Sequence, residues 1–564
     1  MNAPKQNSQQ TSKLKFALKE LLPAYITAFV FCFMITVFEP LLMYSTNQLD
    51  FWFDMPLMIG PVLGGFALSF LASAALFTVV YAVNRLVIRD KDKEPVVYQM
   101  VSIMWFFAFA ATYLQGNLLA GNLPALDGSV IDWDKFSNND ILTLAIWIAL
   151  GGIAIFMLFK LGIKRTLKYS MIGACALFAM LFVSLVTEMI SWNALARKDS
   201  IITTNKNFDR ISTDKNFIVL LNDAIGSVEF NSVLEANPEY KEVFEDFTYY
   251  PDTLGCFPCT RDTIPVVLGG EVNKNEMKFE EFSSKALNNS PFFKELTDNG
   301  YDINLYESEL VWYGDKSYNV SNSADYKNYR LPFATFWREE LKYVSYKYLP
   351  YYYKRYSGIE TMDFNSLVDK YLWDDHTIYT NIIENPELSK TSTKSFRFVH
   401  TEGAHIPFKY DKDLNVLDGY STYEVKIEAT IKMLDAYIDR LKANGAYDNS
   451  VIIVMADHGN TDLNEADDML VRANPMFMVK GLGEHHEFAR SDKPLSYEDL
   501  MGIYSKLLDG MTAEESTADI PDERERFFMW YRNFRLENHI EEYIVTDKAS
   551  EWTKFRKTGR EFDL

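Results

Sequence analysis

The sequence predicts a chain in two parts: a bundle of five transmembrane helices, followed by an α/β domain with a mostly parallel central sheet flanked by helices. Two observations predict this fold class. Long apolar stretches dominate the first third of the 564 residues, and short β-rich runs then alternate with amphipathic helical segments. The expected parts are a cytoplasmic tail (1–19), a transmembrane domain (20–191), a juxtamembrane linker (192–215) and an extracytoplasmic domain (216–564).

The transmembrane prediction rests on the length of the apolar stretches. A helix needs about 20 residues to cross the hydrocarbon core of a bilayer. A cleavable signal peptide is a poor alternative, because the first stretch lacks a small-residue cleavage site and four more stretches follow it. The five stretches cover roughly residues 20–44, 57–84, 98–120, 141–160 and 168–191.

The basic residues of the short loops predict the orientation. Lys and Arg accumulate on the cytoplasmic side of membrane proteins. Here they cluster before the first helix, after the second and after the fourth, whereas Asn47–Asp54 and Leu123–Asp140 contain a single base, Lys135. We therefore expect a multi-pass protein of the cell membrane, with a cytoplasmic N-terminus and an extracytoplasmic α/β domain. The basic residues are Lys13, Lys15, Lys19, Arg85, Arg89, Lys91, Lys93, Lys160, Lys164, Arg165 and Lys168.

Charge and cysteine content narrow the function classes. The formal net charge of −21 argues against a nucleic-acid partner, which would need clustered Lys and Arg. Cys32 and Cys175 fall within predicted membrane helices and suit packing roles. Cys256 and Cys259 form a Cys-x-x-Cys pair on the oxidising side, where either a small disulfide loop or two free thiols fits the sequence. The pair lacks the further ligands of a zinc site.

The outer domain shows the signature of a parallel sheet. Asn216–Leu221, Tyr301–Tyr306 and Phe396–His400 read as strands. Tyr423–Ala443 has apolar residues at helical spacing and leads to the strand Val451–Met455, which makes a βαβ unit. Ligands of such sheets bind beyond the carboxyl ends of the strands.

Metal-binding residue types stand at two of these strand ends. Asp457 and His458 follow Val451–Met455, and Asp223 follows Asn216–Leu221. A carboxylate beside an imidazole can hold a divalent metal. Taken alone, Asp223 would also fit a turn residue or a helix cap. The joint placement favours a metal site.

Two segments have motifs with characteristic spacing. KANGAYDNSVIIVMADHGN contains Asp-His-Gly after a strand, and in GCFPCTRDTIPVVLGGE, Thr260 lies five residues before Pro265 and ten before Gly270. These segments resemble the Asp-His-Gly segment and the nucleophile region of the lipoteichoic acid synthase-like and sulfatase-like families of the alkaline phosphatase superfamily. Ser290–Tyr306 and Val399–Pro407 resemble the next blocks, so the similarity covers nearly all of residues 214–510 in the family's order. This collinearity outweighs any single motif.

The resemblance implies a phosphoglycerol transferase type of enzyme. Asp223, Thr260, Asp457 and His458 would bind one divalent metal ion, Mn²⁺ or Zn²⁺, with Thr260 as the nucleophile. His405 would bind the phosphate or protonate a leaving group, and His400 would assist in substrate binding. The donor would be a phospholipid of the surrounding bilayer, and the acceptor an envelope glycan or polymer.

Some positions depart from these relatives. Phosphoethanolamine transferases carry a His three residues before the Pro of a late loop, whereas this chain has Arg472 before Pro475. Arginine can bind phosphate with two hydrogen bonds, although an exposed surface arginine also fits the sequence. Sulfatases show Cys-x-Pro-x-Arg; Cys256 and Pro258 match this pattern, but Thr260 occupies the Arg position.

Three alternatives therefore stay open: a sulfatase or phosphodiesterase that uses water as acceptor, a phosphoethanolamine transferase, and a catalytically silent glycan-binding membrane protein. The complete set of Asp223, Thr260, Asp457 and His458 argues against the silent protein. His485 and His486 are expected in an exposed loop and are left out of the site.

Overall fold

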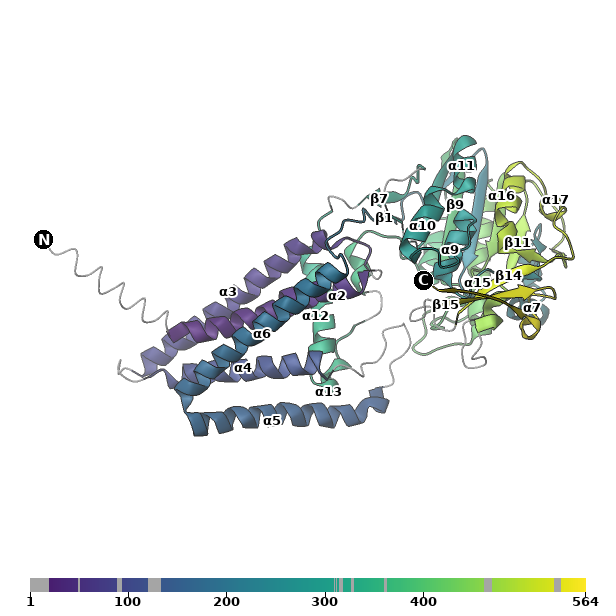
Figure 1. Cartoon of the computed structure of the whole chain (residues 1–564). Coiled ribbons are helices and arrows are strands. Elements are labelled where there is room, and N and C mark those ends of the chain that lie inside the picture. Colours follow the sequence, from purple (N-terminus) through teal and green to yellow (C-terminus); the bar gives the residue numbers. More distant parts are fainter. Residues whose placement is uncertain are drawn as a thin grey trace. The chain divides into compact units, whose positions relative to one another are not determined.

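The computed structural model describes residues 20–48, 51–88, 94–119, 133–308, 310, 312–313, 318–325, 329–359, 363–460, 469–531 and 539–563 (Figure 1). The predicted cytoplasmic tail, residues 1–19, lies outside the described residues. Contacts divide the chain into two compact units. The first comprises Met1–Lys198 and Asn328–Val368, and the second comprises Asp199–Lys327 and Asp369–Leu564.

Five helices of the first unit, among the described residues, are long and apolar enough to cross a membrane, as the sequence predicted. The first contains a π-helical turn, η1 (Met34–Phe38), before α2 (Glu39–Thr46). A short helix, η3 (Trp133–Phe136), precedes the fourth. The candidate spans are Glu20–Thr46, Met55–Val87 (α3), Val96–Asn117 (α4), Asn138–Leu161 (within α5, Ser137–Leu161) and Ile163–Ser191 (α6).

The first unit also contains a segment that the sequence analysis assigned to the outer domain. Asn328–Val368 is inserted between β7 (Ser323–Asp325) and α14 (Asp375–Glu384) of the second unit, yet it packs on the long helices. Its elements are α12 (Phe333–Tyr348), α13 (Tyr351–Lys354) and η4 (Asp363–Leu367). Trp337 Nε1 donates a hydrogen bond to the Pro61 carbonyl of α3 at 3.0 Å, and Lys347 Nζ lies 2.5 Å from Glu39 Oε1. Further contacts join Tyr351 to Thr143, Arg355 to Asp140 and Phe364 to Phe51.

Glu340 of α12 is a buried acid with an unusual environment. Neither carboxylate oxygen of this fully buried residue has a hydrogen-bond partner among the described residues. Burial and the nearby Glu39 carboxylate raise the pKa of Glu340 well above its usual value. The neighbouring Glu339 differs: burial opposes its charged form, but Lys342 and Arg338 outweigh this effect and lower its pKa.

We expect Glu340→Gln to stabilise the protein at neutral pH and to leave it unchanged near pH 4. An acid whose pKa is raised by folding contributes fully to the free energy of unfolding below its unfolded pKa, and this contribution is lost as the pH rises through the folded pKa. Thermal unfolding of the full chain in nanodiscs between pH 4 and 8 measures the effect, which grows by at most about 1.4 kcal/mol per pH unit. Glu339→Gln is the matched control and should show the opposite pH dependence. Parallel curves for the parent and the Glu340 variant would contradict the expectation.

The second unit is built on a seven-stranded, mostly parallel sheet, which confirms the predicted fold class. The strand order is β12-β4-β11-β10-β3-β9-β6, in which β10, β3, β9 and β6 are parallel to one another and β11 is antiparallel to its neighbours. The strands are β3 (Asn216–Asn222), β4 (Thr248–Tyr249), β6 (Tyr301–Tyr306), β9 (Lys394–Thr401), β10 (Ser450–Met455), β11 (Phe477–Lys480) and β12 (Ala489–Arg490).

Helices cover both faces of this sheet (Figure 1). Residues of β3 alternate between two apolar cores, because successive side chains of a strand point to opposite faces. Phe217, Val219 and Leu221 pack with α9, α11 and α16, whereas Ile218 and Leu220 pack with α7, α14 and α15. The helices of the unit are α7 (Ser227–Ala236), α8 (Tyr240–Val243), α9 (Thr260–Gly269), α10 (Phe279–Asn288), α11 (Pro291–Asp298), α14 (Asp375–Glu384), α15 (Tyr423–Ala443), η5 (Met469–Ala473), η6 (Tyr497–Asp499), α16 (Leu500–Leu508), α17 (Ala513–Thr517) and η7 (Trp552–Lys554).

Two predicted boundaries need correction. The linker predicted at 192–215 is folded in its second half, since β1 (Ile201–Thr203) pairs with β7 (Ser323–Asp325) and β2 (Arg210–Ser212) pairs with β8 (Ser389–Thr391). The domain predicted at 216–564 is interrupted by the insertion Asn328–Val368. The short strands β1 and β2 and the insertion lack the long apolar or strongly periodic sequence that would have predicted them. The remaining strands are β5 (Thr253–Leu254) paired with β13 (Leu495–Ser496), and a C-terminal sheet of β14 (Arg526–Trp530), β15 (His539–Val545) and β16 (Arg556–Asp563).

Candidate metal centre and nucleophile

Three side chains meet at the carboxyl ends of two neighbouring strands. Asp223 follows β3, while Asp457 and His458 follow β10, which pairs in parallel with β3. One ligand atom from each of the three residues lies within 4.8 Å of the others. Asp457 and His458 are buried, and the Asp223 side chain is 13% exposed. The sheet thus brings together the two carboxylates and the imidazole that the sequence analysis singled out.

His458 directs one ring nitrogen at both carboxylates. Nε2 lies 3.2 Å from Asp457 Oδ2 and 3.6 Å from Asp223 Oδ1. Nδ1 lies 2.8 Å from the Gly459 carbonyl oxygen, and because a carbonyl only accepts hydrogen bonds, Nδ1 carries the proton. Burial lowers the pKa of His458 to about 4, so the ring is neutral. Its Nε2 lone pair therefore faces two carboxylates.

Asp457 stays ionised in this buried position. Burial disfavours the charged form, but the electrostatic effects of His458 and His400, together with the nearby Thr260 side chain and the hydrogen bond from the Ala224 N–H, hold the pKa below its usual value. The Ala224 N–H donates to Asp457 Oδ1 at 2.9 Å. The Thr260 hydroxyl thus lies at the carboxylate that the sequence analysis assigned to the same metal.

The donor set fits a divalent cation. Two carboxylates facing the lone pair of a neutral imidazole repel one another unless positive charge lies between them. Carboxylate oxygen and imidazole nitrogen are ligands that both Zn²⁺ and Mn²⁺ accept. Asp223, Asp457 and His458 would hold such an ion, with the Thr260 hydroxyl as a further oxygen donor.

Thr260 is the first residue of α9, whose ten residues run to Gly269. Its side chain is half-buried, between the fully buried Cys256–Cys259 segment and the helix. The free N–H groups at a helix N-terminus favour negative charge on nearby oxygens. A phosphoryl oxygen or an ionised Thr260 hydroxyl would be stabilised there.

Of the two alternatives left open for Cys256 and Cys259, a disulfide or two free thiols, the structure has two buried free thiols. Cys259 instead takes part in a polar cluster. Its Sγ lies 2.6 Å from the Tyr531 hydroxyl and 3.3 Å from Asp262 Oδ2, and the Tyr531 hydroxyl donates to Asp262 Oδ2 at 2.7 Å. Burial raises the pKa of both thiols. Tyr531, which follows β14, therefore contacts the residues on both sides of Thr260.

We expect Tyr531→Phe to lower kcat by about tenfold with little change in KM, because the loss of its two hydrogen bonds loosens the residues that orient Thr260. Tyr250→Phe is the matched control. It removes comparable buried hydrogen bonds, from the Tyr250 hydroxyl to the Ala513 carbonyl at 2.8 Å and between that hydroxyl and Thr517 Oγ1 at 3.3 Å, at a similar cost of about 1 kcal/mol, but neither partner is next to Thr260. Equal kcat values in the two variants would mean that Tyr531 acts only on stability.

His400 is held by a carboxylate that the sequence analysis missed. Its Nδ1 lies 2.7 Å from Glu307 Oε2, and its Nε2 lies 3.9 Å from Asp223 Oδ2. Burial opposes protonation, but Glu307, Asp223 and Asp457 outweigh it and raise the pKa of His400 to about 10. Glu307 follows β6 directly. A search for polar residues just beyond the carboxyl ends of the predicted strands, which identified Asp223 and Asp457, would therefore also have identified Glu307.

His405 lies on the loop after β9, close enough to His458 to influence its pKa. Gly403 fixes this loop against the metal centre: its φ is +52°, and the next residue, Ala404, donates its N–H to the Asp223 carbonyl at 2.8 Å. A Cβ on Gly403 would lie 2.3 Å from the Asp223 carbonyl oxygen and 2.5 Å from its nitrogen. The backbone of this loop and the backbone of Asp223 therefore constrain each other's position.

Arg472 is buried rather than exposed, so the surface alternative that the sequence left open does not apply. Its Nη1 donates to the Pro258 carbonyl at 3.2 Å, two residues before Thr260. Burial lowers the pKa of Arg472, although Cys259, Asp223 and Asp457 favour its charged form. The guanidinium is thus positioned between the nucleophile segment and the metal centre, where an anion would meet it.

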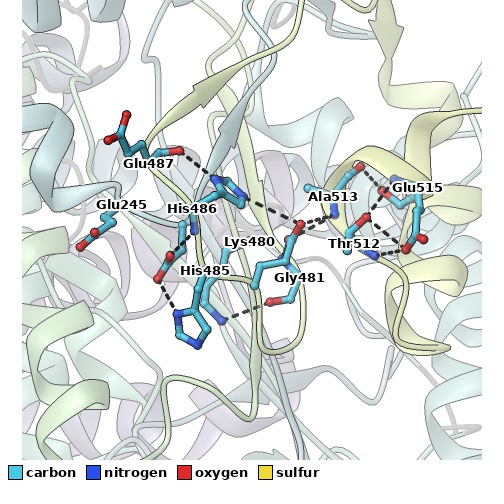
Figure 2. A network of polar contacts seen from close by, with 12 residues as sticks. Glu245, Lys480, Gly481, His485, His486, Glu487, Thr512, Ala513 and Glu515 are labelled. Atoms are coloured by element: carbon cyan, nitrogen blue, oxygen red, sulfur yellow. Dashed lines mark hydrogen bonds and ion pairs between the residues drawn. The ribbon is translucent and has the colours of Figure 1, made fainter.

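His485 and His486 lie outside the metal centre, as expected. His485 is 61% exposed and lies within 3.5 Å of Asp246 and Asp448. Figure 2 shows His486 bonded to the Glu487 carbonyl, in a network that joins the Lys480–Glu487 loop to the start of α17. These histidines organise a loop and provide no site ligand.

The second unit is thus an α/β domain with a candidate metal centre at the carboxyl ends of two parallel strands. The model of the sulfatase family matches residues 215–486. Residues 215–486 are therefore similar to the sulfatase family, which confirms the resemblance stated above at this level. No curated protein matches the sequence.

Several solved structures are similar to this chain at low identity. The lipoteichoic acid synthase LtaP from Listeria monocytogenes is 14% identical, with a TM-score of 0.36, and the match covers 62% of this chain and 86% of that one. An alkaline phosphatase superfamily protein from Vibrio parahaemolyticus is 13% identical (TM-score 0.35, 65% and 85% covered). A putative sulfatase from Bacteroides thetaiotaomicron is 11% identical (TM-score 0.38, 59% and 81% covered). Likeness at this level does not extend to activity.

Proposed function

We propose that this protein is a membrane-anchored, metal-dependent transferase that moves a phosphate-linked head group from a phospholipid to an envelope glycan or polymer. The observation that carries the proposal is the position of Thr260, at the N-terminus of α9 and close enough to Asp457 of the candidate metal centre to lower the pKa of that carboxyl. A hydroxyl in this position can act as a nucleophile.

The reaction would take place in two displacements. Thr260 Oγ1, after losing its proton to water, would attack the phosphorus of the donor. The bond from phosphorus to the lipid oxygen would break, and the lipid alcohol would leave with a proton from His405. The acceptor hydroxyl would then attack the phosphothreonine and pass its proton to His405, and the bond from phosphorus to Thr260 Oγ1 would break, which restores both residues. A divalent ion bound by Asp223, Asp457 and His458 would lower the pKa of the Thr260 hydroxyl and polarise the phosphoryl group.

Other residues would hold the substrate. The Arg472 guanidinium, buried beside the nucleophile segment, is suited to a phosphoryl oxygen. His400 has its Nδ1 held by Glu307 and its Nε2 toward Asp223, and it would donate to a second oxygen. These contacts favour a phosphodiester or phosphomonoester group without choosing between glycerol and ethanolamine.

The five apolar helices favour a lipid donor over a soluble one. They would anchor the enzyme in the cell membrane, where phospholipid is concentrated, with the N-terminus in the cytoplasm and the α/β unit outside. A sulfatase or phosphodiesterase would use the same metal centre with water as acceptor, and the match to the sulfatase family supports this second candidate.

The test uses the full-length protein in nanodiscs with Mn²⁺ or Zn²⁺ and either phosphatidylglycerol or phosphatidylethanolamine, each labelled in the head group. We expect a metal-dependent covalent adduct on Thr260, detected by intact mass and peptide mapping, whose mass identifies the donor. Thr260-dependent cleavage of soluble sulfate or phosphate esters, without an adduct from either lipid, would establish the hydrolase instead. The absence of both reactions would favour a silent binding protein.

A further inference from the structure

The insertion Asn328–Val368 differs in composition from the rest of the chain. Residues 329–359 contain eight of the 33 tyrosines, and six Lys and Arg residues against two Glu, in a protein of formal net charge −21. Tyrosine is enriched at membrane–water interfaces, because its ring is apolar and its hydroxyl polar. The composition therefore fits the boundary of a bilayer better than open water.

The insertion contacts α2 and α3 several residues away from their nearest ends. Lys347 meets Glu39, seven residues before the end of α2, and Trp337 packs over Gly65, ten residues after the start of α3. At 1.5 Å per residue, these points lie about 10 and 15 Å from the helix ends. The 33 residues of α3 extend about 50 Å, which exceeds the hydrocarbon core of about 30 Å by about 20 Å. The contacts thus fall at the depth of the lipid head groups and the upper acyl chains.

The insertion is joined to four of the five spans. Besides α2 and α3, it reaches α4, where the Tyr348 ring leaves no room for a Cβ on Gly116, and α5, where the Tyr351 N–H donates to Thr143 Oγ1 at 3.1 Å. Arg355 and Asp140 of α5 form an ion pair of 3.2 Å. Its outer surface is therefore continuous with the apolar surface of the bundle.

That outer surface is aromatic and aliphatic. Tyr352, Tyr353 and Tyr356, in and just after α13, are 47–68% exposed, and Leu341 and Leu349 are also exposed. The Arg355 guanidinium lies 5.2 Å from the centre of the Tyr352 ring. Exposed Tyr and Leu side chains with a nearby arginine suit contact with acyl chains and phosphates together.

We infer that α12 and α13 form an interfacial element that binds the head-group region of the phospholipid bilayer through Tyr352, Tyr353 and Tyr356. The inference rests on the membrane anchoring proposed above. The chain crosses between its two units at residues 198/199, 327/328 and 368/369, so an insertion fixed in the interface gives the α/β unit two further attachments to the membrane. Such attachments keep the sulfatase-family domain close to a lipid substrate.

The depth of these tyrosines can be measured with spin labels. In the full-length protein with Cys175 replaced by Ser, single cysteines at positions 352, 353 and 356 are labelled in nanodiscs of phosphatidylglycerol and phosphatidylethanolamine. The other native cysteines are buried. Collision with oxygen reports the apolar phase, and collision with a water-soluble nickel complex reports water. Tyr420, an exposed tyrosine of the α/β unit, is the matched control position.

We expect the ratio of oxygen to nickel collisions to be severalfold higher at 352, 353 and 356 than at Tyr420. A label on the native, exposed Cys175 of α6 tests the membrane anchoring separately. A high collision ratio at Cys175, combined with ratios at the three tyrosine positions as low as that at Tyr420, would overturn the interfacial element alone. A low collision ratio at Cys175 would overturn the membrane anchoring. Spectral broadening that disappears on dilution to one protein per nanodisc would assign the surface to a second copy and overturn the inference.

Discussion

Replacing Thr260 with alanine is expected to abolish head-group transfer, with a loss of about 10³-fold or more. The variant removes the oxygen on which the proposed covalent intermediate would form, at the N-terminus of α9. Initial rates with head-group-labelled phospholipid, together with intact-mass analysis, measure the effect. The adduct should disappear along with the activity.

Two controls separate chemistry from structure. Thr260→Ser keeps a hydroxyl at the same place and should retain activity within about tenfold of the parent. Metal content should survive in the alanine variant, because Asp223, Asp457 and His458 remain. Retained transfer by Thr260→Ala would show that another group, or water directly, attacks the phosphorus.

Gly403→Ala should sharply reduce metal binding even though residue 403 carries no ligand. A Cβ at this position would overlap the backbone of Asp223, which cannot move as a flexible side chain would. Displacement of Asp223 would weaken metal affinity by about 10–100-fold, the range typical for residues that support metal ligands. Metal content after dialysis against graded chelator concentrations, measured by mass spectrometry, gives the shift.

Gly445→Ala is the matched control for this substitution. Gly445 also has a left-handed φ, +66°, but no atom lies within 4 Å of the place that a Cβ on this residue would take. Both variants carry the backbone strain of alanine at positive φ, about 1–2 kcal/mol, and only Gly403→Ala adds the overlap with Asp223. Equal metal affinity in the two variants would show that the loop can move away from Asp223 at little cost.

The meeting of Asp223, Asp457 and His458 could be predicted from the sequence because these residues stand at the ends of recognisable strands. Asp223, Asp457 and His458 each follow a short apolar run, and the parallel pairing of β3 with β10 brings those ends together. The helix Tyr423–Ala443 was predicted with the bounds of α15, since its apolar residues repeat at helical spacing. Local pattern was sufficient for these elements.

The contacts that lacked a local pattern were missed. Tyr531 meets Asp262 across 269 positions of sequence, and nothing around Tyr531 indicates this partner. The Cys-x-x-Cys spacing was compatible with a disulfide, but Cys259 caps α9 and its thiol is directed at Tyr531 instead. Contacts between residues far apart in the sequence determine both the partner of Tyr531 and the environment of the Cys259 thiol.

The insertion was missed for a different reason. Residues 329–359 are too polar for a membrane helix, and their amphipathic pattern is equally typical of a helix on a globular domain. Only packing reveals the association with the long helices, through Trp337 on Gly65 and Lys347 on Glu39. A local sequence pattern does not show that such a segment packs on a unit formed mainly by residues far earlier in the chain.

The inserted segment determines how a soluble form of this protein could be prepared. A secreted fragment beginning at Asp199 would retain residues 328–368 but lose every helix on which Trp337 and Tyr348 pack. Their rings would then face water, and aggregation of the fragment is the expected outcome. A well-behaved fragment needs a short polar bridge in place of residues 328–368 as well as removal of the N-terminal helices.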